Sequence, residues 1–275
     1  RVCDYVLMCF LLGNDFLPHF PVLNLRNHGL ERLMRIYKNV IAIKHNEYII
    51  KPDMTIHWRN FKLLVSKLAD HEHSFLLDEY KCRERYDKKL WKLDTQKERD
   101  YAFQSIPLIE RTDEHYICPT EPFWERRYYK SLLYCDDDNH NIQKICNNFM
   151  EGIEWTLKYY CGECPNWKWC YNYHYPPLLT HLKLYLPDFS MDFIKHNSDS
   201  FSHHVQLAFV MPPRRWDLLP LNVRDYLMRN HINIFNHEIS FKWAFCKYFW
   251  EAHVQCITIT LEMLEVWDRE FKTLR

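Results

Sequence analysis

The stretch DYVLMCFLLGNDFLPHFP, residues 4–21, decides the fold that we expect for this chain. Residues 5–12 are apolar without interruption, too few to cross a bilayer and apolar on every side of a helix. A helix made of them must be covered by protein, so we expect a buried element. Gly13 ends this helix, and Pro18 and Pro21 stiffen the chain that leaves it.

The two polar residues after Gly13 are the first candidates for chemistry. Asn14 and Asp15 follow at the end of the expected buried helix. An acidic side chain there must be paired or bind a cation to offset its desolvation, which makes Asp15 a candidate metal ligand. In the alternative interpretation Asp15 is a turn residue or the N-cap of the next helix, and the tripeptide alone favours this alternative.

Composition indicates a globular and mainly helical protein with small β elements. The chain has 275 residues, 47% of them hydrophobic and 16% aromatic, but only 4 Gly, which favours helices with short connections. No apolar run approaches the length of a membrane-spanning helix, so we expect no membrane partner. Because the chain opens with Arg1 directly at an apolar helix, we expect it to be part of a longer polypeptide whose upstream half is a partner of this one.

Charge and cysteine usage limit the classes of function. Lys and Arg total 36 and Asp and Glu total 36, which argues against a bulk nucleic-acid binder and restricts any such contact to local sites. The 11 Cys follow no regular spacing, which favours reduced thiols. We therefore expect a cytoplasmic location, with the nucleus as the alternative.

Periodic patterns predict the elements of the first half. Residues 24–41 predict an amphipathic helix, and residues 46–58 predict an extended segment that enters a second helix. The apolar stripes of these two helices are Leu25, Leu30, Leu33, Ile36 and Tyr37, and Trp58, Phe61, Leu64, Val65 and Leu68. Residues 79–100 mix both charge signs and predict a solvated helix with a Glu79–Arg83 pair, an RNA-gripping patch being the alternative. The stretch from there to Pro122 predicts an irregular connector.

The second half has two polar or aromatic segments of interest. Residues 136–141, DDDNHN, predict a loop leading to a helix N-cap, with a divalent-cation site as the alternative. Residues 149–160 predict a helix, and residues 261–272 a final one. The loop between residues 167 and 175 concentrates aromatic rings, which could form a core cluster or a platform for stacked bases; we expect both, with most of the rings structural and one Trp facing the path of the substrate. The ring-bearing residues of that loop are Trp167, Trp169, Tyr171, Tyr173, His174 and Tyr175.

Three of the thiols lie close to this loop. Cys161, Cys164, Cys170 and His174 have the residue types of zinc ligands, although their spacing differs from that of a common zinc finger. Zinc binding and a metal-free loop both remain open.

Residues 4–21 resemble the second conserved block of the Xrn family of 5′→3′ exoribonucleases, in which an apolar helix delivers a Gly-Asn-Asp-Phe-Leu-Pro-His signature. The block is also similar to the wider flap-endonuclease-like superfamily. FWERRYYKSLLY from Phe123 and FMEGIEWTLKYYCGECPNWKWCYNYHYPPLL, residues 149–179, resemble later segments of the Xrn family. Glu72 and Phe75 would match an acidic residue and a Phe of that family.

The resemblance implies a fold, a set of domains and a set of site residues. It implies the C-terminal part of an α/β flap-endonuclease or PIN-like nuclease core, followed by a helical Xrn-type domain. Residues 1–45 would end the nuclease core, residues 46–122 would form a helical segment and connector, and residues 123–275 would form the helical domain. The implied catalytic metal ligand is Asp15, with Mg²⁺ or Mn²⁺ as cofactor; Gly13, Asn14 and His19 are structural, and the implied RNA-stacking residues are Trp167, Trp169 and His174.

Two functions from different classes follow from the resemblance. The first is part of a metal-dependent 5′→3′ exoribonuclease that degrades single-stranded RNA with a 5′-monophosphate processively to mononucleotides; residues 1–275 alone would be inactive, since two-metal hydrolysis needs several converging carboxylates. The second is a catalytically inactive Xrn-like module that binds RNA or acts as a scaffold. The upstream sequence would separate them.

Overall fold

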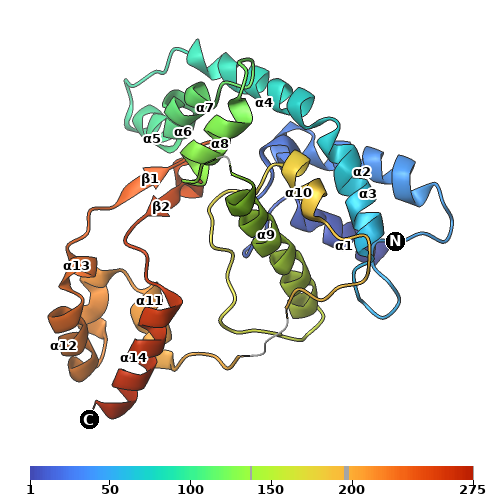
Figure 1. Cartoon of the computed structure of the whole chain (residues 1–275). Helices are drawn as coiled ribbons and strands as arrows, with labels where there is room; N and C mark the ends of the chain where they lie inside the picture. Colours follow the sequence, from blue (N-terminus) through green and yellow to red (C-terminus); the bar gives the residue numbers. More distant parts are fainter. Residues whose placement is uncertain (137, 195–197, 275) are drawn as a thin grey trace. The chain divides into compact units, whose positions relative to one another are not determined.

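The computed structural model describes residues 1–136, 138–194 and 198–274, and it is built mainly of helices (Figure 1). The chain divides into two compact units. Unit 1 comprises Arg1–Pro165, Cys170–Lys195 and Trp243–Ala252, and unit 2 comprises Asn166–Trp169, His196–Lys242 and His253–Arg275. These boundaries differ from the three ranges expected from the sequence, and a PIN-like identity for residues 1–45 stays a prediction.

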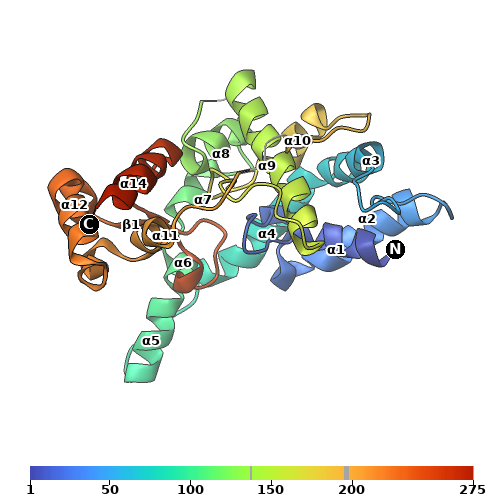
Figure 2. The ribbon, with the colours of Figure 1, turned by 90° about the horizontal axis from the view of Figure 1, so that it is seen from below.

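Unit 1 is mainly helical in its described residues. Its α-helices are α1 (Val2–Phe10), α2 (Gly29–Tyr37), α3 (Trp58–Ala69), α4 (Glu72–Asp87), α5 (Gln96–Gln104), α6 (Ile106–Ile109), α7 (Thr112–Ile117), α8 (Trp124–Leu132), α9 (Asn139–Tyr160) and α10 (Leu179–Tyr185). Short 3-10 turns at Pro21–Leu23, Leu25–Asn27 and Phe249–Glu251 and a π-helical turn at Lys38–Ala42 complete it. Figure 2 shows α5 extending away from the other helices of this unit.

Helix α9 is the long element of unit 1, and it contacts α1 and α10 (Figure 1). Phe149, Ile153 and Leu157 are buried along one face, as the periodicity predicts. Asp138 caps the N-terminus, since its carboxylate accepts a hydrogen bond of 2.9 Å from the backbone N–H of Asn141. The N-cap predicted for residues 136–141 is thus confirmed for Asp138; Asp137 lies outside the described residues.

The predicted core helices of the first half are present. In α3, Trp58, Phe61, Leu64, Val65 and Leu68 are all buried, and the extended segment before it forms an isolated antiparallel bridge between Ile50 and Ile56. In α2, Leu33, Ile36 and Tyr37 are buried. Leu25 is exposed because it lies in a 3-10 turn before α2 begins, so its place in the apolar stripe was wrong.

Helix α1 is covered on one side only within the described residues. Leu7, Met8 and Phe10 are buried, whereas Tyr5 and Val2 are exposed, Val2 to 77%. The expectation of burial on every side is therefore wrong for these residues. Neighbouring elements approach one face of the helix and leave the opposite face open.

The buried acid of α1 is Asp4, at the opposite end from Asp15. Its carboxylate accepts hydrogen bonds from the Tyr37 hydroxyl (2.6 Å) and from the backbone N–H groups of Ile49 (2.9 Å) and Ile50 (2.8 Å). Three donors offset its desolvation, so Asp4 joins α1 to α2 and to the segment before α3.

The charged stretch after residue 79 contains a buried ion network in place of the expected solvated helix. Arg83 in α4 donates to both carboxylate oxygens of Glu114 in α7, at 2.7 and 2.8 Å. Arg111 donates to Glu114 (2.7 Å) and to Asp87 (2.9 and 3.0 Å). The predicted Glu79–Arg83 pair is wrong: Glu79 accepts from the Asn27 side chain instead (2.7 Å). Tertiary partners have replaced the local pairing.

The same network holds a segment from far along the chain. The backbone N–H of Phe245 donates to Glu114 (2.9 Å), and Arg83 donates to the carbonyl of Cys246 (2.9 Å). Residues 105–122, expected to be an irregular connector, form α6 and α7 and carry Glu114 at 0% exposure. The prediction of an irregular connector was wrong, because these residues form helices that are part of the core of unit 1.

Unit 2 is smaller and is built around two tryptophans. It contains α11 (His203–Val210), a 3-10 turn at Pro213–Leu218, α12 (Leu221–Asn230), α13 (Ile232–Phe235), β1 (Ser240–Lys242), β2 (His253–Gln255) and α14 (Leu261–Thr273). The strands pair antiparallel, with Phe241 opposite Val254. Trp216 donates to the Ala208 carbonyl (3.1 Å) and Trp267 to His231 Nε2 (2.9 Å), so both indoles are buried with their N–H groups satisfied. The final helix is confirmed.

In the parts of the chain that the structure describes, every helix is too short or too polar to cross a membrane.

We expect Glu114→Gln to lower the free energy of unfolding by about 3–5 kcal/mol, because it leaves two buried guanidinium groups without their shared carboxylate. Urea unfolding, with the midpoint compared at unchanged slope, measures the effect. Glu110→Gln is the matched control, since Glu110 is exposed. Equal midpoints for the two variants would show that the network adds no stability.

Candidate functional site

The turn that follows α1 is fixed by Gly13 and Asn14. Gly13 has a φ of +91°, and its N–H donates to the Phe10 carbonyl (3.2 Å). The side-chain oxygen of Asn14 accepts from the N–H groups of Phe16 (2.8 Å) and Leu17 (2.9 Å), while the Asn14 N–H donates to the Leu17 carbonyl (3.0 Å). This Asx-type turn satisfies the backbone locally and sets the direction of the next side chain.

Asp15 lies at the tip of this turn and is exposed. Its carboxylate has no hydrogen-bond or ion-pair partner among the described residues. Burial therefore does not force Asp15 to bind a cation, contrary to the expectation from the sequence, because Asn14 makes the inward hydrogen bonds and Asp15 is exposed. What the geometry provides is an unpaired carboxylate on a rigid turn.

Phe16 anchors the turn on α9. Its ring makes edge-to-face contacts with Trp155 (4.8 Å between centroids) and Tyr159 (5.2 Å), and those two rings stack on each other at 5.0 Å. Such aromatic pairs add about 0.5–1.5 kcal/mol each beyond area burial. The position of Asp15 thus depends on a helix more than a hundred residues further along the chain.

His19 closes the other end of the turn. Its Nδ1 lies 3.1 Å from the Phe20 carbonyl oxygen, which accepts a hydrogen bond if Nδ1 carries the proton. Desolvation lowers the pKa of His19, so the ring is neutral at neutral pH. His19 also packs against Gly13, which places it in the structure of the turn.

One buried donor in the turn lacks a partner. The side-chain Nδ2 of Asn14 is buried and makes no hydrogen bond to any described residue. A donor cannot bind a metal ion, but it can hold a carboxylate or a water molecule beside Asp15. Its acceptor must therefore come from solvent or from atoms outside the described residues.

The described residues do not supply a complete metal site. Nowhere in the described parts of the chain do three or more His, Cys, Asp or Glu side chains gather as metal ligands. Asp15 fits a single Mg²⁺ or Mn²⁺ ligand, with further oxygen ligands needed from elsewhere. Cys161, Cys164, Cys170 and His174 are all described and form no such group, so the zinc alternative is not supported.

The predicted stacking residues fall in different units. Trp167 and Trp169 belong to unit 2 and His174 to unit 1. Trp167 is 58% exposed, whereas Trp169 is half-buried. The backbone of this loop is held by Asn166, whose side-chain oxygen accepts from the N–H of Lys168 (2.8 Å) and the hydroxyl of Ser198 (2.5 Å).

Two further rings of the aromatic loop, those of Tyr171 and Tyr175, are structural, whereas a stacking role of His174 stays a prediction. Tyr175 is buried, and the Tyr171 hydroxyl donates to the Tyr175 carbonyl (2.9 Å) while its ring packs on Phe149 (5.6 Å). His174 is exposed. Trp167 is therefore the tryptophan of this loop with most of its surface available for a base.

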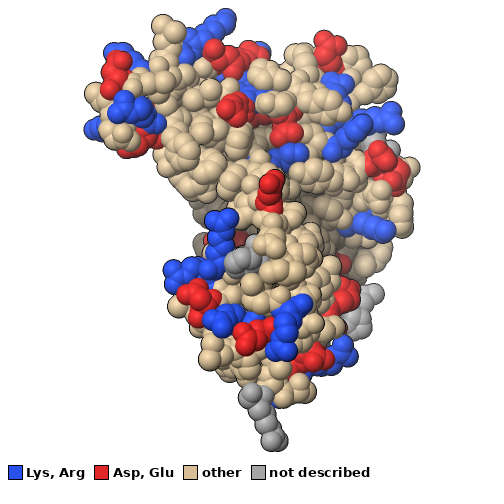
Figure 3. Space-filling model, turned by 90° about the vertical axis from the view of Figure 1, so that its left-hand side faces the viewer, with Lys and Arg blue, Asp and Glu red and all other residues tan. Residues whose placement is uncertain are grey.

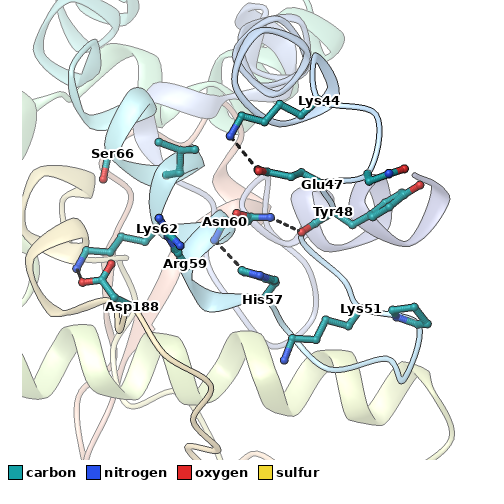
Figure 4. A pocket seen from close by; sticks show the side chains of 13 residues that line it. Lys44, Glu47, Tyr48, Lys51, His57, Arg59, Asn60, Lys62, Ser66 and Asp188 are labelled. Atoms are coloured by element: carbon teal, nitrogen blue, oxygen red, sulfur yellow. Dashed lines mark hydrogen bonds and ion pairs between the residues drawn. The ribbon is translucent and has the colours of Figure 1, made fainter.

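A hollow of about 590 Å³ beside α3 was missed in the sequence (Figure 4). Its basic residues are Lys44, Lys51, Arg59 and Lys62, and we call it the basic pocket. Its signal in the sequence is four cations between residues 44 and 62, in a chain whose overall charge is balanced.

We expect Gly13→Ala to lower the free energy of unfolding by about 1–3 kcal/mol, because an L residue is strained at this φ. An added Cβ would also lie 3.0 Å from the His19 Cβ and 3.1 Å from its backbone nitrogen. Gly162→Ala is the matched control: its φ is +94°, but an added Cβ meets no atom within 4 Å. Thermal unfolding of both variants isolates the cost of the His19 contact, and equal losses would show that this contact has no effect.

Comparison with known proteins identifies the family of this chain. A family model described as the Xrn1 helical domain matches residues 1–118 and 110–254. The 5'-3' exoribonuclease 2 of Gallus gallus is 26% identical, over 80% of this chain and 29% of that protein. The 5'-3' exoribonuclease 1 of Homo sapiens is 24% identical, over 82% of this chain and 15% of that protein.

A third relative shows a shorter but closer match. The 5'-3' exoribonuclease 1 of Saccharomyces cerevisiae is 32% identical over 99 residues, which are 35% of this chain and 6% of that protein. The chain thus spans less than a third of the length of these relatives. Because the family model covers most of the described helices, the chain belongs to the Xrn family of 5′→3′ exoribonucleases, whose helical domain it contains.

Proposed function

We propose that this protein is a metal-dependent 5′→3′ exoribonuclease that degrades single-stranded RNA carrying a 5′-monophosphate, processively and to mononucleotides. The observation that carries the proposal is the exposed, unpaired carboxylate of Asp15 on a turn that Gly13, Asn14 and Phe16 hold rigid. A carboxylate kept accessible at a fixed position is suited to bind a divalent cation. The names of the relatives support the reaction class.

In this proposal the chain's own residues position one ligand and one part of the substrate. Bound Mg²⁺ or Mn²⁺ would activate water and stabilise the leaving oxygen of the phosphodiester. Asp15 would contribute one oxygen ligand, and the unpartnered Nδ2 of Asn14 would donate to a neighbouring oxygen acceptor. Because the described residues offer no cluster of ligands, the other carboxylates would come from the upstream half of the polypeptide.

Trp167 would stack on a base of the single strand. An exposed indole on a loop held by Asn166 and Ser198 offers a flat face on which any base can stack. Stacking on an aromatic ring contributes about 1–3 kcal/mol per base and does not depend on sequence. This would suit an enzyme that steps along RNA of any sequence.

The second candidate is a catalytically inactive Xrn-like module that binds RNA or acts as a scaffold. It is favoured by the lack of a multi-ligand metal cluster in the described part of the chain. Both candidates predict RNA binding, and only the first predicts divalent-cation-dependent hydrolysis.

Asp15→Asn should abolish divalent-cation-dependent degradation in the whole polypeptide and leave its unfolding midpoint unchanged, because Asp15 makes no stabilising contact here. The assay uses 5′-labelled RNAs that differ only in a 5′-monophosphate, a 5′-triphosphate or a cap. Asp94→Asn, a change at another exposed acid, is the control. Wild-type rates in Asp15→Asn would remove the ligand assignment, and an inactive wild-type protein would favour the scaffold.

Trp167→Ala should weaken binding of single-stranded RNA by about 1–3 kcal/mol without lowering thermal stability. Trp169→Ala, at the half-buried neighbour, should lower stability instead. Trp250→Ala is the matched control, since Trp250 is exposed to 69% in unit 1. Fluorescence anisotropy with a labelled oligonucleotide measures affinity; unchanged affinity in Trp167→Ala would leave the loop with a structural role only.

A further inference from the structure

The basic pocket is formed within unit 1 by the segment that precedes α3, by α3 itself and by the segment after α10 (Figure 4). Its volume of about 590 Å³ is in the range of small-molecule and nucleotide sites. It shares no residue with the turn that carries Asp15. Its lining residues are Lys44, Asn46, Glu47, Tyr48, Lys51, Pro52, His57, Arg59, Asn60, Lys62, Leu63, Ser66 and Asp188.

The pocket carries more positive than negative charge. Four of its side chains are Lys or Arg and two are Asp or Glu, which leaves a net charge of 4 − 2 = +2 from these residue types. Each acid already has a cation: Lys44 pairs with Glu47 at 2.9 Å, and Lys62 pairs with Asp188 at 2.8 Å. Figure 4 shows these pairs on different sides of the pocket.

Lys51 and Arg59 are the cations left over. The Lys51 ammonium has a Ser190 hydroxyl at 3.5 Å, and Arg59 has no ion-pair or hydrogen-bond partner among the described residues. The face drawn in Figure 3 has no comparable excess of positive charge, since its Lys and Arg side chains are interspersed with Asp and Glu. The lining of the pocket thus has an excess of positive charge in a chain that is neutral overall, although Asp53, an exposed acid outside the lining, interacts electrostatically with Lys51.

Rigid backbone surrounds these two cations. Asn60 donates from its side chain to the Tyr48 carbonyl (2.8 Å), and His57 Nδ1 accepts from the Asn60 N–H (3.3 Å), capping α3. Arg59 lies in the first turn of α3, whose dipole adds positive potential there. The pocket is therefore pre-formed for an anion.

The surroundings of the Tyr48 ring indicate whether the pocket binds a backbone phosphate or a base. Tyr48 is the pocket's phenol, and the Arg1 guanidinium already lies 4.6 Å from the centroid of its ring. A base would have to compete with Arg1 for that face, whereas a phosphate needs only the two free cations. Guanidinium groups match phosphate oxygens in a two-point geometry.

We propose that the basic pocket binds phosphate groups of a single-stranded RNA backbone through Lys51 and Arg59. The inference rests on the proposed function in that RNA is the substrate, and it adds a contact that is separate from the Asp15 turn. Such a contact is independent of sequence and holds the strand during successive steps.

The test compares the double variant Lys51→Glu, Arg59→Glu with the double variant Lys92→Glu, Lys97→Glu, which makes the same charge change at exposed positions. Binding of a fluorescent oligouridylate to the whole polypeptide is measured in EDTA, so that no hydrolysis intervenes, across a series of salt concentrations. We expect the pocket variant to lose at least about tenfold in affinity, and its log–log salt slope to fall by about 1.4, or 0.7 for each of two phosphate contacts. The control should change little.

A Lys51→Gln, Arg59→Gln variant separates loss of attraction from added repulsion and should still lower the affinity and the salt slope. Unfolding midpoints confirm that each variant is folded. Equal losses in the pocket variant and the control, or an unchanged slope in the pocket variant, overturn the assignment. Competition by uridine monophosphate or inorganic phosphate as strong as that by the oligonucleotide also overturns it, in favour of a small-molecule site.

Failure of the pocket and failure of the proposed function give different results. A wild-type protein that binds RNA but is not affected by the pocket variant refutes the pocket alone. A protein with the expected pocket effect in EDTA and no hydrolysis with Mg²⁺ refutes the exonuclease alone. A wild-type protein that binds no RNA refutes both.

Discussion

A single carboxylate, that of Glu114, joins three parts of unit 1 that are distant in sequence. It accepts from Arg83 in α4, from Arg111 beside α7 and from the backbone N–H of Phe245. Burying one acid between two guanidinium groups is tolerated because each of its oxygens has more than one donor. The arrangement fixes α4 and α7 and holds the 243–252 segment in the same unit, so much of the helical framework depends on it.

That framework also decides where the candidate chemistry lies. The Asp15 turn is locally complete through Gly13 and Asn14, but its placement depends on Phe16 packing against Trp155 and Tyr159 of α9. Helix α9 is in turn capped by Asp138 and packed against α10, whose first N–H groups donate to Glu72. The packing of α9 and α10 thus fixes the turn that carries the exposed carboxylate of Asp15.

The net charge of the chain gives no indication of the basic pocket. The chain is neutral, and on the face drawn in Figure 3 Lys and Arg are interspersed with Asp and Glu, so the overall charge favours no partner. Inside the basic pocket Lys44 pairs with Glu47 and Lys62 with Asp188, which leaves neither acid of the lining for Lys51 and Arg59. Specific binding of an anion requires only such a local excess in a pre-formed hollow.

The sequence by itself determined the helices, caps and helix ends that depend on neighbouring residues. The 3.6-residue period of α3 and α14, the N-cap at Asp138 and the end of α1 near Gly13 depend on neighbouring residues, and all are present. The Gly-Asn-Asp-Phe-Leu-Pro-His signature also pointed to the family. The role of Asp15 in metal binding stays a prediction, because a metal site needs several ligands and the residues next to Asp15 do not supply them.

Tertiary structure alone decided which charged side chains are buried. Nothing in the spacing of Glu79 and Arg83 distinguishes a solvated pair from two buried groups with partners at Asn27 and Glu114. Likewise Asp15 was expected to be buried and is exposed, while Asp4 is the buried acid. The physical reason is that the free energy of a charged side chain depends on its desolvation and on the donors around it, and in a folded chain those donors come from segments that only the tertiary fold brings together.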